Sequence, residues 1–519
     1  MEKFFLLFKN MTLFLGIFSL VLFSSCGDDD KELPVAPTIS IDGATTIISK
    51  SGENFSVDLT LNAPGGNKEL VVSTNGGLLE TVTLDADITS FTYNTQQVPS
   101  DAEEGEEFEF QFSLTDLANQ ESPEVDFIIN AALYDQVVIG GESLYNVTIP
   151  ADGIVTGGTS VKFITGRNYY ITEPLSFESG SSFTIEEGVA VYMEKPTEEN
   201  ELDVEINLNS GTVVSITGTN TAPVVMTPST VLTGDPQPGD WNRLDLDGTT
   251  NAVVRYLRTE YASEGMRMDD LNNTNTIEYV QTYLSKDEGV YITDGDLNVK
   301  YIINTRSGDT GFRLGDNYQG TLQFIINHGS EHGETDFHVR ETAGIVAANM
   351  TLIGAGQEAA EGDDVLEIDA INNTFKIYNT IVTEALDEDL KFDAGDMDIT
   401  DLSGTNVLAY SYFFNNNDPL KDNAVDFFGT FDETGALLTN PFFNNALSGG
   451  PDPKNIVFEV IDGIGVNDFI PDAEQPAKEN FDPATVNDIF VSAPFVGAVR
   501  DAANDWTVGW VKNIDGTIR

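Results

Sequence analysis

Cysteine, histidine and basic residues are scarce in this chain of 519 residues, and their scarcity excludes several classes of protein. Cys26 is the single cysteine, so an intramolecular disulfide framework is excluded. Lysine and arginine number 25 against 85 aspartates and glutamates, which gives a formal net charge of −60 and excludes nucleic acid as a partner. Hydrophobic residues still make up 40% of the chain, so the acidity belongs to a folded protein with a large core.

The N-terminus has the pattern of a lipoprotein signal peptide over residues 1–25. Lys3 and Lys9 flank an apolar run over 11–23, and two serines precede Cys26. We therefore predict cleavage before Cys26 and acylation of its thiol, with palmitate among the acyl groups. The alternative is an ordinary secretory signal that happens to precede a cysteine. No later apolar run is long enough to span a bilayer.

Residues 26–33 form an acidic tether that contains three consecutive aspartates. This run resembles the export signal that directs Bacteroidetes lipoproteins to the outer face of the outer membrane. The resemblance implies a lipid-anchored protein at the cell surface, and the periplasmic face of the outer membrane is the alternative. In either case the tether is a solvated, charged segment.

Residues 34–134 alternate between apolar and polar positions, as strands of a sandwich do. The period of two is strict over 55–61 and 108–114, and glycine pairs at 65–66 and 76–77 indicate turns. A segment of this length with six or seven such strands predicts an immunoglobulin-like β-sandwich. The sequence thus predicts an all-β protein whose first domain is a spacer that follows the tether.

Residues 140–519 carry a repeat marked by Tyr256, Tyr279, Tyr301 and Phe324, at spacings of 23, 22 and 23 residues. Each aromatic follows an apolar and a polar residue. A repeat of this length predicts a right-handed parallel β-helix, because the asparagines and leucines of a leucine-rich repeat are missing. We expect the four aromatic rings to stack in register inside the coil, with the polar residue facing water.

A second strand recurs in each rung as a triplet of residues. Its first and third residues are apolar, and its middle residue is either long and polar or aromatic. Its middle residues are Arg267, Tyr291, Arg313 and His338, which we expect to form one outward ladder with steps of about 4.8 Å. One interpretation is that long side chains simply cover a sheet face. The other is a strip that binds a glycan, an anionic group or a partner strand through guanidinium groups and an aromatic ring.

The three histidines of the protein, His328, His332 and His338, lie within eleven residues of one another and are interspersed with carboxylates. Imidazoles and carboxylates on one loop suit zinc or another transition metal, so a divalent cation is the candidate cofactor. Against this prediction, His338 occupies an outward strand position and glycines in the segment indicate a loose loop.

Several short sequence segments resemble those of an uncharacterised family of Bacteroidetes surface lipoproteins with a right-handed parallel β-helix domain. They include 182–188, 239–241, 258–262 and the closing segment 495–510. The resemblance implies fold and location and carries no settled activity. Solenoids need caps at their open ends, and we expect Trp506 and Trp510 to close the C-terminal end of this coil.

The predicted function is that of an outer-membrane lipoprotein that acts without catalysis, as a ligand-binding or glycan-binding component or beside an outer-membrane transporter. The alternatives are an adhesive or structural surface protein, and a polysaccharide lyase or hydrolase, which rests on fold analogy alone. No catalytic residue is predicted, because acids are abundant and pairs such as Asp269 with Asp270 and Asp363 with Asp364 fit solvated turns.

Overall fold

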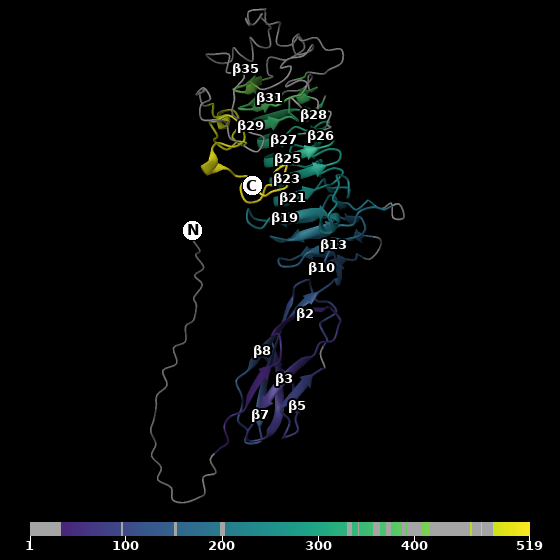
Figure 1. The fold of residues 1–519 in the computed structure, drawn as a ribbon, viewed down its shortest axis with the longest axis vertical. Helices are drawn as coiled ribbons and strands as arrows, with labels where there is room; N and C mark the ends of the chain where they lie inside the picture. The colour runs from purple at the N-terminus through teal and green to yellow at the C-terminus, as the bar shows by residue number, and fades with distance from the viewer. Residues whose placement is uncertain are drawn as a thin grey trace, which may run out of the picture. The chain divides into compact units, whose positions relative to one another are not determined.

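The chain is built almost wholly of β-strands (Figure 1). The computed structural model describes residues 33–94, 97–149, 153–197, 203–329, 335–340, 342–356, 364–369, 375–386, 391, 407–414, 457–458, 469 and 481–519. The predicted signal peptide, most of the tether with Cys26, and His332 lie outside the described residues. Within the described part, no helix has the length and apolar character needed to cross a membrane.

The chain divides into two compact units. The first comprises the residues up to Ile47 together with Asn54–Gln97 and Glu107–Asn130, and the second comprises Ile48–Glu53, Val98–Glu106 and Ala131–Arg519. Two short segments before residue 107 therefore group with the second unit.

The first unit contains two antiparallel sheets, and the sandwich is confirmed. One has the order β1-β3-β6 and the other β2-β8-β7-β4-β5. Alternate residues are buried, as Leu59 and Leu61 on β3 and Phe112 and Leu114 on β7 are, because successive side chains of a strand point to opposite faces. The strands are β1 Thr38–Ile41, β2 Thr46–Lys50, β3 Val57–Asn62, β4 Asn67–Thr74, β5 Gly77–Thr83, β6 Ser90–Tyr93, β7 Glu107–Asp116 and β8 Val125–Ala132.

The second unit is the parallel β-helix that the repeat predicts. One sheet has nine parallel strands, and we call it the ladder sheet. Its strands are β11 Ile154–Val155, β14 Leu175–Phe177, β17 Ile206–Leu208, β20 Leu244–Asp247, β22 Met266–Asp269, β24 Val290–Thr293, β26 Thr310–Leu314, β28 Thr335–Val339 and β30 Asp364–Ile368.

The other faces of the coil are joined by long strands that bend from one face to the next, and Figure 1 shows them stacked. The bent strands are β21 Val253–Glu260, β23 Thr276–Ser285, β25 Asn298–Ser307, β27 Thr321–His328 and β29 Ile345–Ile353. Shorter strands precede and follow them: β9 Asp135–Ile139, β10 Glu142–Val147, β12 Ser160–Phe163, β13 Tyr169–Ile171, β15 Ser182–Ile185, β16 Ala190–Met193, β18 Val213–Thr217, β19 Val224–Pro228, β31 Phe375–Tyr378, β32 Ile381–Thr383, β33 Val407–Ala409, β34 Tyr412–Phe414 and β35 Val457–Phe458. Among the described residues, the helical elements are α1 Thr230–Thr233 and the 3-10 turns η2 Pro483–Thr485 and η3 Ala502–Asn504.

The four repeat aromatics stack in register, but they lie outside the coil's core and not inside it as expected. Ring centroids of Tyr256, Tyr279, Tyr301 and Phe324 are 4.5, 4.5 and 4.7 Å apart in turn. Each of these residues has a left-handed backbone, with φ between 50° and 60°. This conformation bends the strand at a corner, so the residue after it turns inward while the aromatic points outward. Leu257, for example, is fully buried in the core cluster.

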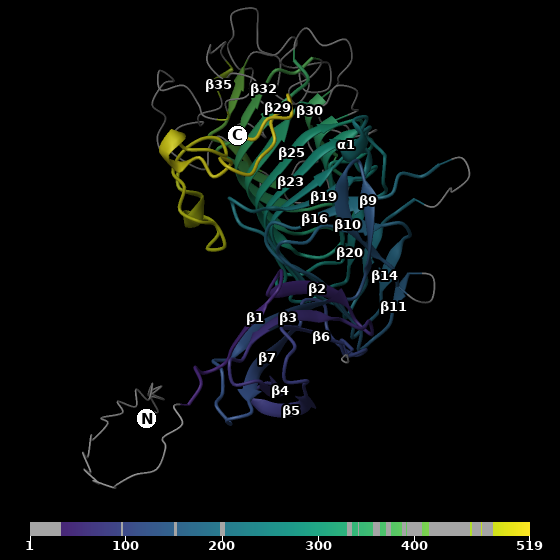
Figure 2. The ribbon, with the colours of Figure 1, turned by 60° about the horizontal axis from the view of Figure 1, so that its bottom comes forward.

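The aromatic stack is covered by the C-terminal strap, which we define as residues 481–519. The Trp506 ring lies 5.2 Å from Tyr301, and the Trp510 ring lies 5.7 Å from Tyr256. Figures 1 and 2 show this yellow segment running beside the stacked strands. The expected end cap is therefore corrected: both tryptophans cover the flank of the coil, because the aromatic corner leaves an apolar stripe there. Trp510 is fully buried, as a core residue would be.

Inside the coil lies a ladder of polar side chains that is fully buried. Thr282 donates to Asn304 at 2.9 Å, and Asn304 donates to Asn327 at 2.8 Å. These residues are register partners on β23, β25 and β27. A glycine faces the amide in each rung, and a Cβ on Gly289 would meet the side chain of Asn304 and the carbonyl oxygen of Gly311 at 2.6 Å. The glycine positions of the repeat are thus set by the buried amides.

Replacing Gly289 with alanine should lower the free energy of unfolding of the β-helix by about 1–3 kcal/mol, because the backbone carbonyl cannot move away cheaply. Thermal and urea denaturation would measure this change. Gly77→Ala is the matched control, since Gly77 is not left-handed and its Cβ would come no closer than 3.6 Å to another atom. Similar melting curves for both variants would contradict the packing described for the buried amides.

Candidate functional site

The outward ladder of the ladder sheet is the candidate site. Arg267 pairs with Tyr291, Tyr291 with Arg313, and Arg313 with His338 as register partners across β22, β24, β26 and β28. The residues on either side of each are buried, so the middle side chains point away from the core. The four predicted ladder residues are therefore brought together in the predicted order.

The ladder continues beyond the four residues that the sequence singled out. Asp245 precedes Arg267 and Glu367 follows His338 in the same register. Each is a polar residue between two apolar ones: Asp245 lies between Leu244 and Leu246, and Glu367 lies between Leu366 and Ile368. The pattern that identified the ladder would have found them too, had it been extended by one rung in each direction.

Tyr291 lies between two guanidinium groups. The Arg267 carbon Cζ is 4.9 Å from the centre of the Tyr291 ring, and the Arg313 Cζ is 5.1 Å from it on the neighbouring rung. Such cation–π contacts are each worth about 0.5–1 kcal/mol at exposed sites. The three side chains thus hold one another in fixed positions on the sheet.

Each arginine of the ladder also has a carboxylate partner. Arg313 Nη1 lies 2.5 Å from Glu288 Oε1, and Arg267 Nη2 lies 3.4 Å from Asp269 Oδ2. The side chains of the arginines are 29% and 27% exposed, so they reach solvent without being free of the protein. The strip is consequently close to neutral, with alternating donors and acceptors.

Asp245 is the ladder carboxylate with the most altered acidity. Burial raises its pKa to about 6, against the opposing charges of Arg243 and Arg267, and the nearby Glu264 and Asp247 raise it further. Arg243 Nε lies 3.4 Å from the carboxylate. Near neutral pH this group therefore changes charge beside the first arginine of the ladder.

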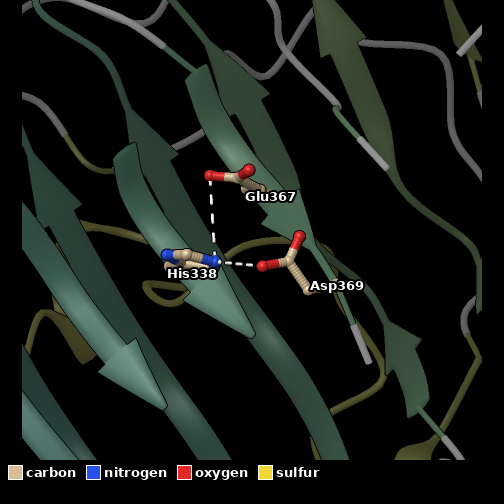
Figure 3. Close-up of side chains that lie close together, drawn as sticks. All are labelled: His338, Glu367 and Asp369. Carbon is tan, nitrogen blue, oxygen red and sulfur yellow. Dashed lines mark hydrogen bonds and ion pairs between the residues drawn. The ribbon is translucent and has the colours of Figure 1, made fainter. Parts of the chain in front are cut away.

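The far end of the ladder gathers His338, Glu367 and Asp369 (Figure 3). His338 Nε2 lies 2.8 Å from Asp369 Oδ2 and 3.9 Å from Glu367 Oε2. One potential ligand atom from each residue lies within 4.8 Å of the others. This grouping, which the sequence did not indicate, is the set among the described residues that could hold a metal ion.

The predicted metal set of His328, His332 and His338 is not the one the structure brings together. His328 ends β27, on a different sheet from His338, and its ring is buried against Phe469 at 5.3 Å. Burial, together with the charges of Arg306 and Arg519, lowers its pKa to about 3, so the ring is neutral. His332 lies outside the described residues. His338 instead meets carboxylates from the next rung.

Asp364 is buried and not part of a solvated turn, which corrects the expectation for this acid. It opens β30 with its side chain fully shielded, and Lys391 Nζ lies 2.9 Å from its carboxylate and 3.2 Å from that of Glu367. Burial alone would lower the pKa of Lys391, but the two carboxylates raise it above its ordinary value. Asp363 lies outside the described residues, and Asp269 pairs with Arg267.

Replacing Asp245 with asparagine should stabilise the protein more at pH 7.5 than at pH 4.5. The pKa of this carboxyl is higher in the folded chain than in the unfolded chain. Its stabilising contribution to the free energy of unfolding is therefore present below about pH 4 and is lost as pH rises through about 6. We expect the difference to be about 1 kcal/mol after solvent screening. Urea denaturation of parent and variant at both pH values measures it, with exposed Asp247→Asn as control. An equal effect at both pH values would contradict the burial of Asp245.

Part of the β-helix matches a family of known proteins. Residues 155–254 match the family described as "Pectate-lyase like beta helix domain". No curated protein was found to match the chain. The resemblance to Bacteroidetes surface lipoproteins stays a prediction.

Three solved structures are similar to parts of the chain. A family 28 exopolygalacturonase from Yersinia enterocolitica has 10% identity over 74% of this chain and 88% of that one, with a TM-score of 0.23. Pectate lyase PelI from Erwinia chrysanthemi, solved with tetragalacturonic acid, has 10% identity over 66% and 85%, with a TM-score of 0.13. Fibronectin(III)-like modules of CbhA from Clostridium thermocellum have 15% identity over 20% of this chain and half of that one, with a TM-score of 0.16.

TM-scores this low support no statement about function. The family match and the stacking of the strands agree on the fold, because the matched residues lead directly into the rungs from β21 onward, which continue the same parallel register. The second unit of this chain therefore contains a parallel β-helix, of which residues 155–254 match the pectate-lyase-like family.

Proposed function

We propose that the protein is an exported, lipid-anchored surface protein whose β-helix binds a glycan along the outward ladder without catalysis. The observation that carries the proposal is the unit of Tyr291 between Arg267 and Arg313, with a carboxylate beside each arginine. The match to a pectate-lyase-like family supports a glycan as the class of ligand. Cys26 and the preceding signal sequence support the anchor, and the acidic tether supports exposure at the cell surface.

A hydroxyl-rich ligand fits this strip better than a simple anion does. Both arginines already have carboxylate partners, so an anion would have to compete with Asp269 and Glu288. A sugar hydroxyl both donates and accepts hydrogen bonds, and it can bind guanidinium and carboxylate together. The faces of the Tyr291 ring are occupied by guanidinium groups, so we expect sugars to contact the edges of the strip.

Replacing Arg267 and Arg313 together with alanine should lower the affinity for the bound glycan at least about tenfold, because two charge-assisted donors are removed. The ligand is first identified on an array of neutral and uronic acid glycans, and affinities are then measured by calorimetry. Because the strip is nearly neutral, we expect only a weak dependence on salt. The melting temperature should fall by a few degrees, since an ion pair and a cation–π contact are lost at each arginine.

Arg255→Ala is the matched control, because Arg255 lies on β21 outside the ladder sheet and its side chain is 49% exposed. It should leave glycan binding unchanged. Equal affinity of the double variant and the parent would exclude the ladder as the binding strip. Release of reducing ends or unsaturated sugars would indicate the polysaccharide hydrolase or lyase instead, and loss of cell adhesion on deletion without glycan binding would indicate the adhesive alternative.

Replacing Cys26 with alanine should move the protein from the membrane fraction to the soluble fraction of its host, because the acyl chains supply the membrane affinity. Labelled palmitate incorporation and cell fractionation measure this change, and protease treatment of intact cells tests exposure at the surface. Ser25→Ala, which keeps a small residue before the cysteine, is a control for general effects on export. Unaltered membrane association of the cysteine variant would be incompatible with the lipid anchor.

A further inference from the structure

We propose that His338, Glu367 and Asp369 form a binding site for a divalent transition metal such as Zn²⁺. This inference goes beyond the proposed function and does not depend on glycan binding. The three side chains come from two adjacent rungs. His338 and Glu367 are register partners on β28 and β30, and Asp369 follows two residues after Glu367, so it points to the same side of the strand.

The distances fit a metal site before any metal is bound. Ligand atoms in a tetrahedral zinc site lie roughly 3.3 Å apart, given metal–ligand bonds of about 2.0–2.2 Å. Here His338 Nε2 lies 2.8 Å from Asp369 and 3.9 Å from Glu367, and all three atoms lie within 4.8 Å. Small side-chain rotations would place all three around one ion.

Within the described part of the chain, the surrounding contacts orient the Glu367 carboxylate and leave a free acceptor atom on Asp369. Glu367 accepts from Thr335 at 2.5 Å through Oε2, and its Oε1 lies 3.2 Å from Lys391 Nζ. Among the described residues, the Oδ1 atom of Asp369 is buried without a hydrogen-bond partner. The backbone is also fixed, because Asp369 N donates to Val339 O at 2.8 Å and Ile368 N donates to Lys391 O at 2.9 Å. Such supporting contacts commonly accompany metal ligands.

The local charge equals the charge that a divalent ion would bring, with opposite sign. Asp364, Glu367 and Asp369 contribute three formal negative charges and Lys391 one positive charge, which leaves −2 beside the His338 ring. The proton on Nε2 that now bonds to Asp369 would be replaced by the metal. The imidazole nitrogen selects zinc, nickel or copper over calcium and magnesium, which prefer oxygen ligands.

The three ligand side chains are largely buried and still reach solvent, with exposures of 12%, 9% and 14% for His338, Glu367 and Asp369. An ion can therefore enter and keep a water molecule as a fourth ligand. The site belongs to a rigid sheet and does not need the loop between His328 and Thr335.

The mature full-length chain should bind one Zn²⁺ per molecule in calorimetric titration, and millimolar Ca²⁺ should not displace it. His338→Gln and Asp369→Asn should each weaken zinc binding at least about tenfold. Glu278→Gln is the matched control for a general loss of acidic charge, because Glu278 pairs with Arg255 on another sheet, and it should bind as the parent does. Circular dichroism establishes that each variant is folded.

Two further readouts separate this site from adventitious binding. Cu²⁺ bound in place of zinc should show nitrogen hyperfine coupling in its electron paramagnetic resonance spectrum, and His338→Gln should remove that coupling. His332→Ala tests the set that the sequence suggested and should leave binding intact. Zinc binding that survives His338→Gln, that is lost in His332→Ala, or that calcium abolishes would overturn the proposal. Glycan binding is tested separately through Arg267 and Arg313, which lie outside the metal site, so the two proposals can fail separately.

Discussion

The in-register stacking of parallel strands is the constraint on which the rest of this β-helix depends. Once each rung lies about 4.8 Å above the last, whatever occupies one position of the repeat must suit its neighbours above and below. The outward ladder, the aromatic stack and the buried amides are three results of this one rule. They differ only in which way the position points: to solvent, under the C-terminal strap, or into the interior.

The aromatic corner shows how the chain offsets a local cost. A non-glycine residue in the left-handed region costs about 1–2 kcal/mol, and this occurs at four successive aromatic corners. Stacking of each ring on the next returns about 0.5–1.5 kcal/mol per pair, and burial under the strap adds more. Arg258 and Gln281 hold the strap by donating to the carbonyls of Trp510 and Lys512. The strap therefore stabilises the corner along several rungs.

The ladder also explains how so acidic a protein presents arginines on its surface. Each guanidinium has a carboxylate and an aromatic face nearby, so the strip exposes paired groups and not isolated charge. At its far end the balance shifts to carboxylates around one imidazole. A hydroxyl-rich ligand and a divalent cation would thus bind adjacent parts of the same sheet, for different chemical reasons. His338 belongs to both, because it is the last ladder residue and the nitrogen donor of the triad.

Much of the fold could be predicted from periodicity, because strand alternation and a repeat of 22 or 23 residues leave few architectures open. The sandwich, the β-helix and the order of the outward ladder followed from these patterns. The side of the strand on which the four aromatics lie could not be predicted. A single left-handed residue exchanges the inward and outward positions that follow it, and the pattern of apolar and polar residues does not reveal a backbone angle. The place of Trp506 and Trp510 was equally hidden, since nothing in the sequence measures where a C-terminal segment returns.

The candidate site divides in the same way. The sequence by itself determined the ladder of Arg267, Tyr291, Arg313 and His338, because residues one repeat apart become neighbours once the period is known. Only the tertiary structure decided the partners of those residues. Asp369 directly follows β30, and Lys391 forms a parallel bridge with Glu367, but the rungs after β28 are longer than the repeat, so no fixed spacing relates them to His338. Proximity in sequence had grouped His338 with His328 and His332, whereas stacking of rungs placed it beside carboxylates about thirty residues further along the chain.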